Sequence, residues 1–236
     1  MVSGQPLLLI LAADRRELSR VPAIPAQAGV RWSAIGEVGG FRALLAANGP
    51  GRENARSAVE RIAARHRLAA VVSAGYVGAL DPQLTLGAVF LPETVRCLET
   101  ALEYSVSLPV YPASSPASRG RLLTIDRVAQ TGREKADLRR QGANAVDMEA
   151  SAVAAAAREQ RLPFFAVRVV SDRADSDFPL DFNRARRADG TFSRWRIAVQ
   201  AGLSPSRWRA LGALKRDADL ASSNLSGFLR QCQFPL

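Results

Sequence analysis

One stretch of the chain, residues 145–175, restricts the fold more than any other part of the sequence. It reads AVDMEASAVAAAAREQRLPFFAVRVVSDRAD. Ala150–Arg161 is rich in alanine, the best helix former, and contains no glycine or proline, which predicts a helix that ends at Leu162-Pro163. Ala145–Asp147 before the helix and the apolar run Phe164–Val170 after it are predicted as strands. A strand–helix–strand unit of this kind is typical of an α/β fold.

Two acidic residues stand where these predicted strands end. Glu149 follows Ala145–Asp147 closely, and Asp172 follows Phe164–Val170. Open α/β sheets bind their ligands outside the carboxyl ends of the strands. We therefore expect Glu149 and Asp172 to lie at the same end of neighbouring parallel strands.

The rest of the chain continues the α/β pattern with further apolar runs and amphipathic segments. The other predicted strands are Leu7–Ala13, Arg31–Val38, Phe41–Ala47, Ala69–Ala74 and Gly120–Asp126. The other predicted helices are Arg52–His66, Arg133–Arg140 with a solvated face, and Ala218–Gln231. The glycine-containing segment Gly75–Leu80 is expected to form a loop.

Composition narrows the class of protein. The 236 residues are 47% hydrophobic, which suffices for one substantial core, and there is no run of about 18 apolar residues to span a membrane. A secretory signal is not expected either. Cys97 and Cys232 are the only cysteines, so a reducing, cytoplasmic setting fits and a thiolate metal site does not. His66 is the only histidine, which leaves acid–base chemistry to carboxylates.

The segments VDMEAS (146–151) and VRVVSDRAD (167–175), at this spacing, resemble the purine nucleoside phosphorylase and nucleosidase superfamily. The chain is similar to methylthioadenosine/S-adenosylhomocysteine nucleosidases, to futalosine hydrolases and, over nearly its whole length, to hopanoid-associated phosphorylase-like proteins. The resemblance implies a single nucleoside phosphorylase-like α/β domain over residues 1–236. It has a mixed, twisted central sheet flanked by helices, and a basic helical C-terminal segment, 184–236. It also implies a homo-oligomer.

The resemblance assigns roles to three carboxylates. Glu17 matches the nucleosidase glutamate that follows the first strand and acts as general base on the attacking water. Asp172 matches the acid that protonates the leaving purine, and Glu149 the residue that holds the ribose hydroxyls. Cleavage of an N-glycosidic bond passes through an oxocarbenium-like sugar, which needs a nucleophile on one side and a protonated leaving group on the other. We expect the three carboxylates to converge on one pocket.

Further residues are expected to contact the substrate. Gly75 and Tyr76 lie in the segment that is similar to the glycine-rich loop around the ribose, although the nucleosidases usually have a small hydroxyl residue where Tyr76 stands. The resemblance also implies that Met148 packs on the sugar face and that Ser171 positions Asp172. It places Val128 and Ala129 beside the purine.

The nucleophile stays open between water and phosphate. Glu17 favours water. The turn before the predicted helix Arg52–His66 presents unpaired N–H groups that could bind an anion, and the candidate anion-binding residues are Gly49, Gly51 and Arg52. No metal and no cofactor is expected. Phosphate remains a possible co-substrate.

The net charge of +10 suggests an acidic partner, but the chain has no motif that reads nucleic acid. Residues 184–216 contain nine Lys or Arg, with Trp195 and Trp208 among them. Basic residues and tryptophan on an amphipathic helix suit a membrane surface, whereas the alternative is a helical cap with buried tryptophans. Arg194–Arg209 is thus a candidate peripheral contact with the inner membrane face.

The sequence therefore predicts an enzyme that cleaves the N-glycosidic bond of an adenine-type purine nucleoside, by hydrolysis or phosphorolysis. The resemblance to hopanoid-associated proteins implies adenosylhopane, a nucleoside with a lipid tail, as substrate. Methylthioadenosine, S-adenosylhomocysteine and futalosine are the alternatives. A nucleoside- or lipid-binding module without activity is the non-enzymatic alternative, and the presence of all three carboxylates argues against it.

Overall fold

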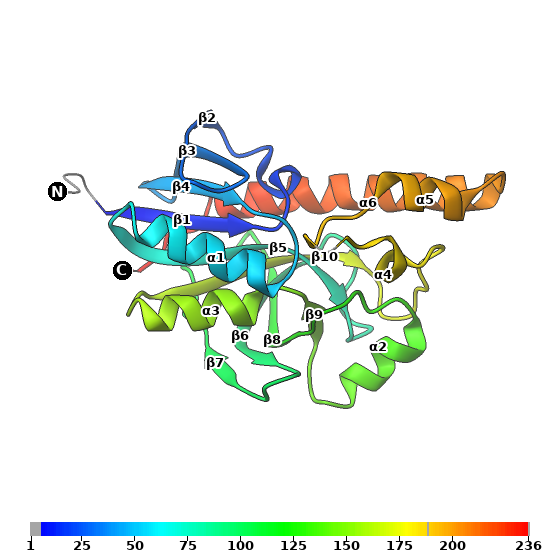
Figure 1. The fold of residues 1–236 in the computed structure, drawn as a ribbon. Coiled ribbons are helices and arrows are strands. Elements are labelled where there is room, and N and C mark those ends of the chain that lie inside the picture. The colour runs from blue at the N-terminus through cyan, green and yellow to red at the C-terminus, as the bar shows by residue number, and fades with distance from the viewer. Residues whose placement is uncertain (1–5, 188, 236) are drawn as a thin grey trace.

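The fold is built on a ten-stranded mixed sheet with helices on both faces, as the computed structural model shows for residues 6–187 and 189–235 (Figure 1). The strands are β1 (Leu7–Ala12), β2 (Ala23–Pro25), β3 (Trp32–Val38), β4 (Phe41–Ala47), β5 (Leu68–Ala79), β6 (Val89–Cys97), β7 (Glu103–Ser105), β8 (Ala117–Thr124), β9 (Ala145–Asp147) and β10 (Phe164–Asp172). The helices are the short 3-10 helix η1 (Arg15–Leu18) and α1 (Arg52–Ala63), α2 (Gly132–Arg139), α3 (Ala150–Glu159), α4 (Phe182–Ala185), α5 (Arg194–Ala201) and α6 (Pro205–Leu229).

The sheet curls on itself around β5. The strand order is β10-β6-β8-β9-β5-β1-β4-β3-β2, with β7 beside β6, and β5 pairs with β10 as well. This additional pairing closes β5, β10, β6, β8 and β9 into a ring, while β1 to β4 extend from β5 as an open sheet. The strands β4, β1, β5 and β10 run parallel to one another, and the hairpin β3–β4 is antiparallel. The predicted mixed α/β sheet is confirmed.

Helices cover the two faces of the sheet separately. Figure 1 shows α1 and α3 side by side on one face and α6 on the other. Val59 and Ile62 of α1 and Val153 of α3 are buried in one apolar cluster with β5 and β10. Leu225 and Leu229 of α6 are buried in a second cluster, on the opposite face. The order of helices and strands predicted for residues 145–175 is confirmed.

The prediction of a loop at Gly75–Leu80 is wrong. β5 continues to Ala79, and Ser73 to Gly78 stay in parallel register with β10. Val77 and Ala79 are buried at alternate positions, so this part of β5 contributes to the core as any central strand does. The two glycines at 75 and 78 instead leave space for neighbouring side chains.

The prediction that Glu149 and Asp172 follow neighbouring parallel strands is also wrong. β9 and β10 lie on opposite sides of β5, and β9 is antiparallel to β5. Gly78 of β5 is nevertheless paired with both of them, with Val146 on one side and Asp172 on the other. The ring closure, which no local pattern specifies, brings the two segments to the same part of β5.

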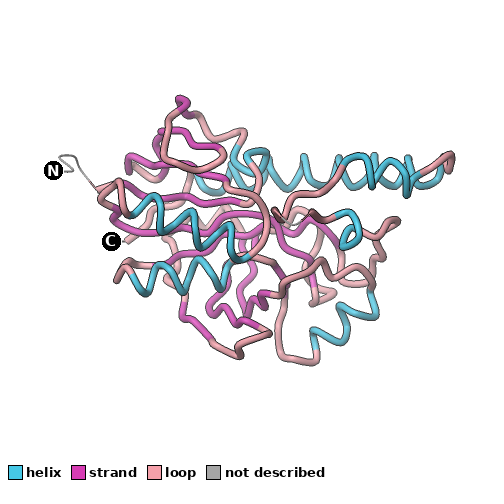
Figure 2. Tube along the Cα trace, viewed as in Figure 1, coloured by secondary structure: helices cyan, strands magenta, loops and turns pink. Residues whose placement is uncertain are grey.

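The C-terminal helices leave the body of the molecule. Figure 2 shows α5 and the first half of α6 projecting past the sheet as a helical hairpin. All the buried residues of α6 lie in its second half, from Ala221 to Leu229. None of the described helices combines the length and apolar character that a membrane crossing requires.

Candidate active site

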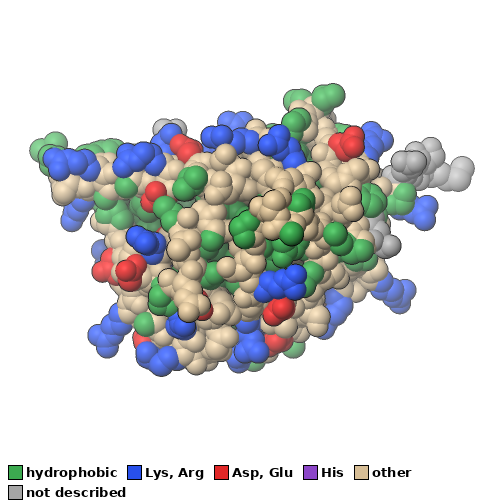
Figure 3. Space-filling view, turned by 180° about the vertical axis from the view of Figure 1, so that it is seen from behind, with side chains coloured by type: hydrophobic (Ala, Val, Ile, Leu, Met, Phe, Trp, Pro, Cys, Tyr) green, Lys and Arg blue, Asp and Glu red, His purple; other side chains and the backbone are tan. Residues whose placement is uncertain are grey.

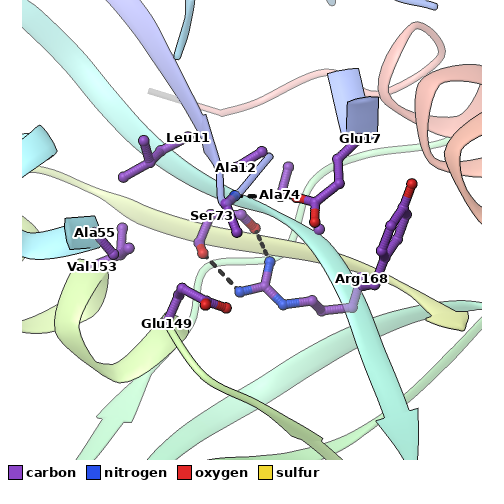
Figure 4. A pocket seen from close by; sticks show the side chains of 12 residues that line it. Leu11, Ala12, Glu17, Ala55, Ser73, Ala74, Glu149, Val153 and Arg168 are labelled. Atoms are coloured by element: carbon purple, nitrogen blue, oxygen red, sulfur yellow. Dashed lines mark hydrogen bonds between the residues drawn. The ribbon is translucent and has the colours of Figure 1, made fainter. Parts of the chain in front are cut away.

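A small polar cavity lies where β1, β5 and β10 meet the start of α3. Its volume is about 30 Å³. Figure 4 shows Glu17, Glu149 and Arg168 directed toward it from three different elements. The full set of lining residues is Leu11, Ala12, Ala13, Glu17, Ala55, Ser73, Ala74, Gly75, Tyr76, Glu149, Val153 and Arg168. A cavity of this size and polarity accommodates a water molecule, which needs a volume of roughly 10–15 Å³ and two to four polar partners.

Glu17 is held in the cavity by the turn that follows β1. Asp14 accepts a hydrogen bond from Arg16 N–H and caps η1, which turns Glu17 inward to leave the residue only 6% exposed. The Ala13 N–H donates to Glu17 Oε2 at 3.1 Å. Burial, and next the negative charge of Glu149, raise the pKa of Glu17 to about 8. A carboxyl with a pKa near neutral is the kind that can accept a proton from water.

Gly75 makes room for this carboxyl. A Cβ atom at position 75 would lie 3.0 Å from Glu17 Oε2, closer than side chains normally approach. The predicted substrate-contact residue Gly75 is therefore next to Glu17 on β5, and its lack of a side chain lets the base sit against the strand.

Glu149 enters the cavity from the start of α3. The Gly51 N–H donates to its Oε1 at 2.7 Å. Gly51 has a φ of 101°, a conformation that glycine adopts readily and other residues do not, and it lies immediately before α1. Burial, and next the charge of Asp147, raise the pKa of Glu149 to about 7, against the opposing influence of the Gly51 N–H and Arg168.

The predicted anion site at the turn before α1 is not what the structure shows. The Gly51 N–H binds the carboxylate of Glu149, and the Gly49 N–H donates to the Ala13 carbonyl at 3.0 Å. Arg52 forms an ion pair with Glu99. The donors that were expected to bind phosphate thus have partners within the protein, and the anion that the turn recognises is a glutamate.

Arg168 is the central cation of the site, and the sequence interpretation missed it. It lies on β10, 2% exposed, and donates from Nη2 to Asp147 Oδ2 at 2.8 Å and from both Nη atoms to Ser73. Its Nε–H has no hydrogen-bond partner within the described part of the chain. A buried donor without a partner costs free energy, and a water molecule in the adjoining cavity could accept from it. The signal in the sequence was a single arginine inside the apolar run FFAVRVV.

Asp147 and Thr124 hold this arginine and the start of α3 together. Thr124 Oγ1 donates to Asp147 Oδ1 at 2.7 Å, and the Ala150 N–H donates to Asp147 Oδ2 at 2.8 Å. Because Asp147 has its hydrogen-bonding capacity filled in this way, its charge can stay buried beside Arg168. The acidic residue of VDMEAS that precedes Glu149 is thus a support for the cavity.

Asp172 lies apart from this cavity. Lys135 of α2 is completely buried and donates from Nζ to Asp172 Oδ2 at 2.5 Å and to the Arg173 carbonyl at 2.6 Å. Ser171 Oγ donates to Asp172 Oδ1 at 2.8 Å, so the predicted contact of Ser171 with Asp172 is present. α2 has the solvated face that was predicted for Arg133–Arg140, but its Lys135 side chain is turned inward and covers the end of β10.

The three carboxylates therefore do not share one pocket in this structure. Glu17 lies against Gly75, and Asp172 lies 2.9 Å from the position of a Cβ atom on Gly78. Positions three residues apart on a strand are about 10 Å apart and face opposite sides. Glu17 and Glu149 meet in the cavity, while Asp172 stands further along the same strand at the end of β10.

The other predicted substrate-contact residues lie in different local environments near the Glu17–Glu149 cavity and elsewhere. Tyr76 borders the cavity, and its hydroxyl donates to the Ala218 carbonyl of α6 at 3.1 Å. Met148 is half-buried next to Glu149, and Ala129 is buried in an apolar cluster of its own with β8 and α2. Val128 is bonded through both of its main-chain polar groups to the side chain of Asn183.

No metal centre accompanies these residues in the part of the chain that is described. Among residues 6–187 and 189–235, no three His, Cys, Asp or Glu side chains are grouped so that they could hold an ion. The polar side chains that line the cavity are two carboxyls, a guanidinium and the hydroxyl-bearing Ser73 and Tyr76.

Comparisons with known proteins agree with this fold. A model of the phosphorylase superfamily matches residues 113–193, which include Glu149 and Asp172. The methylthioadenosine/S-adenosylhomocysteine nucleosidase of Mycobacterium bovis is 24% identical over 195 residues, 63% of this chain and 76% of that protein.

Solved structures extend the likeness over almost the whole chain. The methylthioadenosine/S-adenosylhomocysteine nucleosidase of Neisseria meningitidis, in complex with methylthio-immucillin-A, superposes with a TM-score of 0.71 at 17% identity and covers 96% of this chain and 98% of that one. The futalosine hydrolase of Helicobacter pylori superposes with a TM-score of 0.70 at 15% identity, covering 96% of both chains. The resemblance to the nucleoside phosphorylase and nucleosidase superfamily, and the α/β fold that it implied, are confirmed.

Proposed function

We propose that this chain, a relative of the nucleosidases of the phosphorylase superfamily, is an enzyme that hydrolyses the N-glycosidic bond of an adenine-type nucleoside. The observation that carries the proposal is the cavity between Glu17, Glu149 and Arg168. It has room for water, a carboxyl whose pKa is raised to about 8, and an arginine N–H that lacks an acceptor among the described residues. Those are the requirements for holding and deprotonating a water nucleophile.

The same cavity argues against phosphate as the nucleophile. Two of the side chains around it are carboxyls, and its guanidinium, that of Arg168, is already paired with Asp147. Ionised carboxylates would repel phosphate at this distance. The donors of the turn before α1, which a phosphorylase would direct at the anion, bind Glu149 and the main chain instead.

In the proposed reaction Glu17 takes a proton from water as its oxygen attacks the anomeric carbon of the sugar. Glu149 accepts hydrogen bonds from the sugar hydroxyls and keeps the anomeric carbon next to the water. The bond to the base breaks, and its electron pair goes to the ring nitrogen of the base. Asp172 is the proposed carrier of the proton that the leaving base takes up. In the resting site it is ionised and paired with Lys135, so it first takes up a proton when the base displaces Lys135, and then passes that proton to the ring nitrogen.

The main chain of Val128 supports an adenine-type base. Its N–H donates to Asn183 Oδ1 at 2.9 Å, and its carbonyl accepts from Asn183 Nδ2 at 3.0 Å. Only this orientation of the carboxamide satisfies both groups. The N1 and 6-amino edge of adenine presents the same acceptor and donor side by side, whereas the corresponding edge of hypoxanthine presents them reversed. We infer that Asn183 occupies the position of the adenine edge until the substrate displaces it.

An Asn183→Ala variant is expected to bind adenine nucleosides more tightly. Two hydrogen bonds at about 0.5–1.5 kcal/mol each no longer compete with the base, so KM should fall by about five- to a hundredfold with kcat nearly unchanged. Steady-state kinetics of adenine release measures both constants. Asn224→Ala removes a carboxamide that bonds only the Gly87 carbonyl, and serves as the control with unchanged KM. A KM that rises in Asn183→Ala would contradict the displacement.

The reaction class is tested by product analysis. The protein is incubated with methylthioadenosine, S-adenosylhomocysteine, adenosine and inosine, with and without inorganic phosphate, and the base and the sugar are identified. We expect free adenine and a free sugar at a rate that phosphate does not change, and little reaction with inosine. A sugar 1-phosphate as product would replace hydrolysis by phosphorolysis, and release from none of these nucleosides would favour a binding module of the same fold.

Two finer statements stay predictions of the resemblance. Adenosylhopane is a candidate substrate because a lipid-tailed nucleoside fits with the exposed apolar side chains of α5 and α6, Trp195, Val199, Leu203 and Trp208. The nucleosidases named above are the basis for methylthioadenosine, S-adenosylhomocysteine or futalosine as the alternative. A homo-oligomer and a cytoplasmic location are likewise expected from the resemblance and from the composition.

A further inference from the structure

The hairpin formed by α5 and the first half of α6, residues 194–216, which we call the C-terminal arm, projects from the body of the protein. Residues 205–216 have no buried member, and at 1.5 Å per residue these twelve residues extend about 18 Å. Figures 1 and 2 show the arm passing beyond the end of the sheet with its turn, residues 202–204, at the tip. An overhang of this length has one side of each helix without a packing partner in the described chain.

Large apolar side chains are exposed along the arm. Leu203, in the turn at the tip, is fully exposed. Val199 and Trp208, in the helical turns next to it, are 55% and 50% exposed, and Trp195, at the start of α5, is 68% exposed. Trp208 Nε1 donates to the Gly202 carbonyl at 3.0 Å, so its polar atom is satisfied within the arm. Exposed apolar side chains scattered singly are common, but four of them on one projecting hairpin indicate a surface that a bilayer or another molecule covers.

The charge of the arm is of one sign. Residues 193–216 contain six Lys or Arg and no Asp or Glu. Arg207 and Arg209 are exposed near the tip, Arg196 is exposed at the start of α5, and Lys215 and Arg216 lie further back on α6. Figure 3 shows Lys and Arg side chains along the projecting arm and apolar side chains at its end.

We propose that the C-terminal arm docks the protein on the surface of an anionic lipid bilayer, with Leu203 and Trp208 near the tip and Trp195 on α5 in the interface. Tryptophan and leucine at the boundary between headgroups and acyl chains, with arginines directed at lipid phosphates, are the chemistry that such a surface selects. A second copy of this chain fits less well, because two arms with this excess of positive charge repel each other.

Docking by the arm would bring the substrate site near the lipid. α4, whose Asn183 bonds Val128, is the helix that precedes α5 in the chain, and Ala218 of α6, two residues beyond the arm, accepts a hydrogen bond from the Tyr76 hydroxyl. Along the chain the arm is thus flanked by two segments that contact predicted substrate-binding residues. A nucleoside that carries a lipid tail could then reach the site without leaving the bilayer surface. This access route rests on the proposed function, whereas docking of the arm on a bilayer does not.

The experiment is co-sedimentation of the full chain with large unilamellar vesicles. One set contains phosphatidylcholine with about 30% phosphatidylglycerol, and the other contains phosphatidylcholine alone. We expect binding to the anionic set at about 0.1 M salt, at least tenfold weaker binding to the neutral set, and loss of binding at about 1 M salt, where the Debye length falls from about 10 Å to about 3 Å.

Two pairs of variants assign the binding to the arm. Trp195→Ala/Leu203→Ser removes the two most exposed apolar side chains of the arm. Arg209→Gln/Arg216→Gln removes two charges. Each pair is expected to weaken binding to anionic vesicles at least tenfold. The matched controls are Ile24→Ser, an exposed apolar side chain of β2, and Arg61→Gln/Arg67→Gln, exposed arginines at the end of α1 and beyond it. The controls should bind as the wild type does.

Three outcomes would overturn the proposal. The first is a wild type that does not sediment with anionic vesicles at low salt, and the second is arm variants that bind as well as the wild type. The third is an arm that holds two copies of the chain together. In that case light scattering would show a wild-type dimer, and the Trp195→Ala/Leu203→Ser variant would be a monomer with unchanged vesicle binding. Turnover of water-soluble adenosine, which the arm variants should retain, separates failure of docking from failure of the proposed enzyme.

Discussion

A Glu17→Gln variant is expected to release base about 10²- to 10⁴-fold more slowly than the wild type, which is the usual contribution of one general base. The amide has nearly the shape of the carboxyl and keeps an oxygen that can accept the Ala13 N–H. It cannot take a proton from water. Steady-state adenine release measures the loss, and an unchanged kcat would remove Glu17 from the reaction.

The pH dependence of the wild type identifies the same group. A base acts in its ionised form, and burial with the nearby charge of Glu149 raises the pKa of Glu17 to about 8. We therefore expect kcat/KM to rise with pH up to about 8, and the residual activity of Glu17→Gln to lack this rise. Glu149→Gln is the matched control in the same cavity. It removes the charge that raises the pKa of Glu17, so the rise should move to lower pH, and KM should increase because a sugar contact is lost.

Stability distinguishes loss of the base from misfolding. The pKa of Glu17 is higher in the folded chain, at about 8, than the ordinary value of 4.5. A carboxyl whose pKa is higher in the folded chain contributes to the free energy of unfolding. The contribution is complete below the pKa of the unfolded chain and is lost as the pH rises through the pKa of the folded chain. Glutamine stays neutral, so the variant should unfold at a temperature no lower than that of the wild type at about pH 9. A variant that is less stable at every pH would indicate that the fold, and with it the cavity, has been disturbed.

Local patterns were sufficient for most of the helices and strands. The alanine-rich helix α3 and the apolar strand β10 lie within two residues of their predicted ends, because helix propensity and burial act there in the same direction. The glycines at 75 and 78 misled the interpretation of β5. Glycine is typical of loops, but here it accommodates Glu17 and Asp172, and that reason appears only when distant segments are placed together.

The site was harder to predict than the fold because its partners come from distant parts of the chain. Glu17 and Glu149 were identified by resemblance, and the structure brings them to one cavity. Arg168 could have been found, since a charged residue in a buried strand requires an internal partner. Lys135 could not, since its helix carries no apolar stripe and its burial depends on how α2 docks over the end of β10.

Asp172→Asn is expected to abolish base release, but this variant alone would not show why. Asp172 is the anionic partner of Lys135, which is completely buried and keeps only carbonyl oxygens as acceptors when the carboxylate is lost. Removing one partner of a buried ion pair costs about 3–5 kcal/mol. The single variant should therefore unfold at a lower temperature, and its inactivity has two explanations, a missing acid and a damaged site.

The double variant Lys135→Met/Asp172→Asn separates them. It removes both charges and leaves a methionine of similar length in the place of the lysine, and replacement of a buried ion pair by apolar side chains is often neutral for stability. We expect the thermal stability to return most of the way to that of the wild type. If Asp172 protonates the leaving base, adenine release should stay about 10²- to 10⁴-fold below that of the wild type.

Asp175→Asn provides the matched control, because it makes the same substitution three residues further along SDRAD at an exposed position. Its turnover and its unfolding temperature should equal those of the wild type. Wild-type turnover in the restored double variant would show that Asp172 is one half of a structural ion pair, and that the leaving base receives its proton from another group. The position of Asp172 outside the Glu17 cavity makes this the decisive comparison: the cavity makes Glu17 the candidate base, and the pair of variants tests the acid.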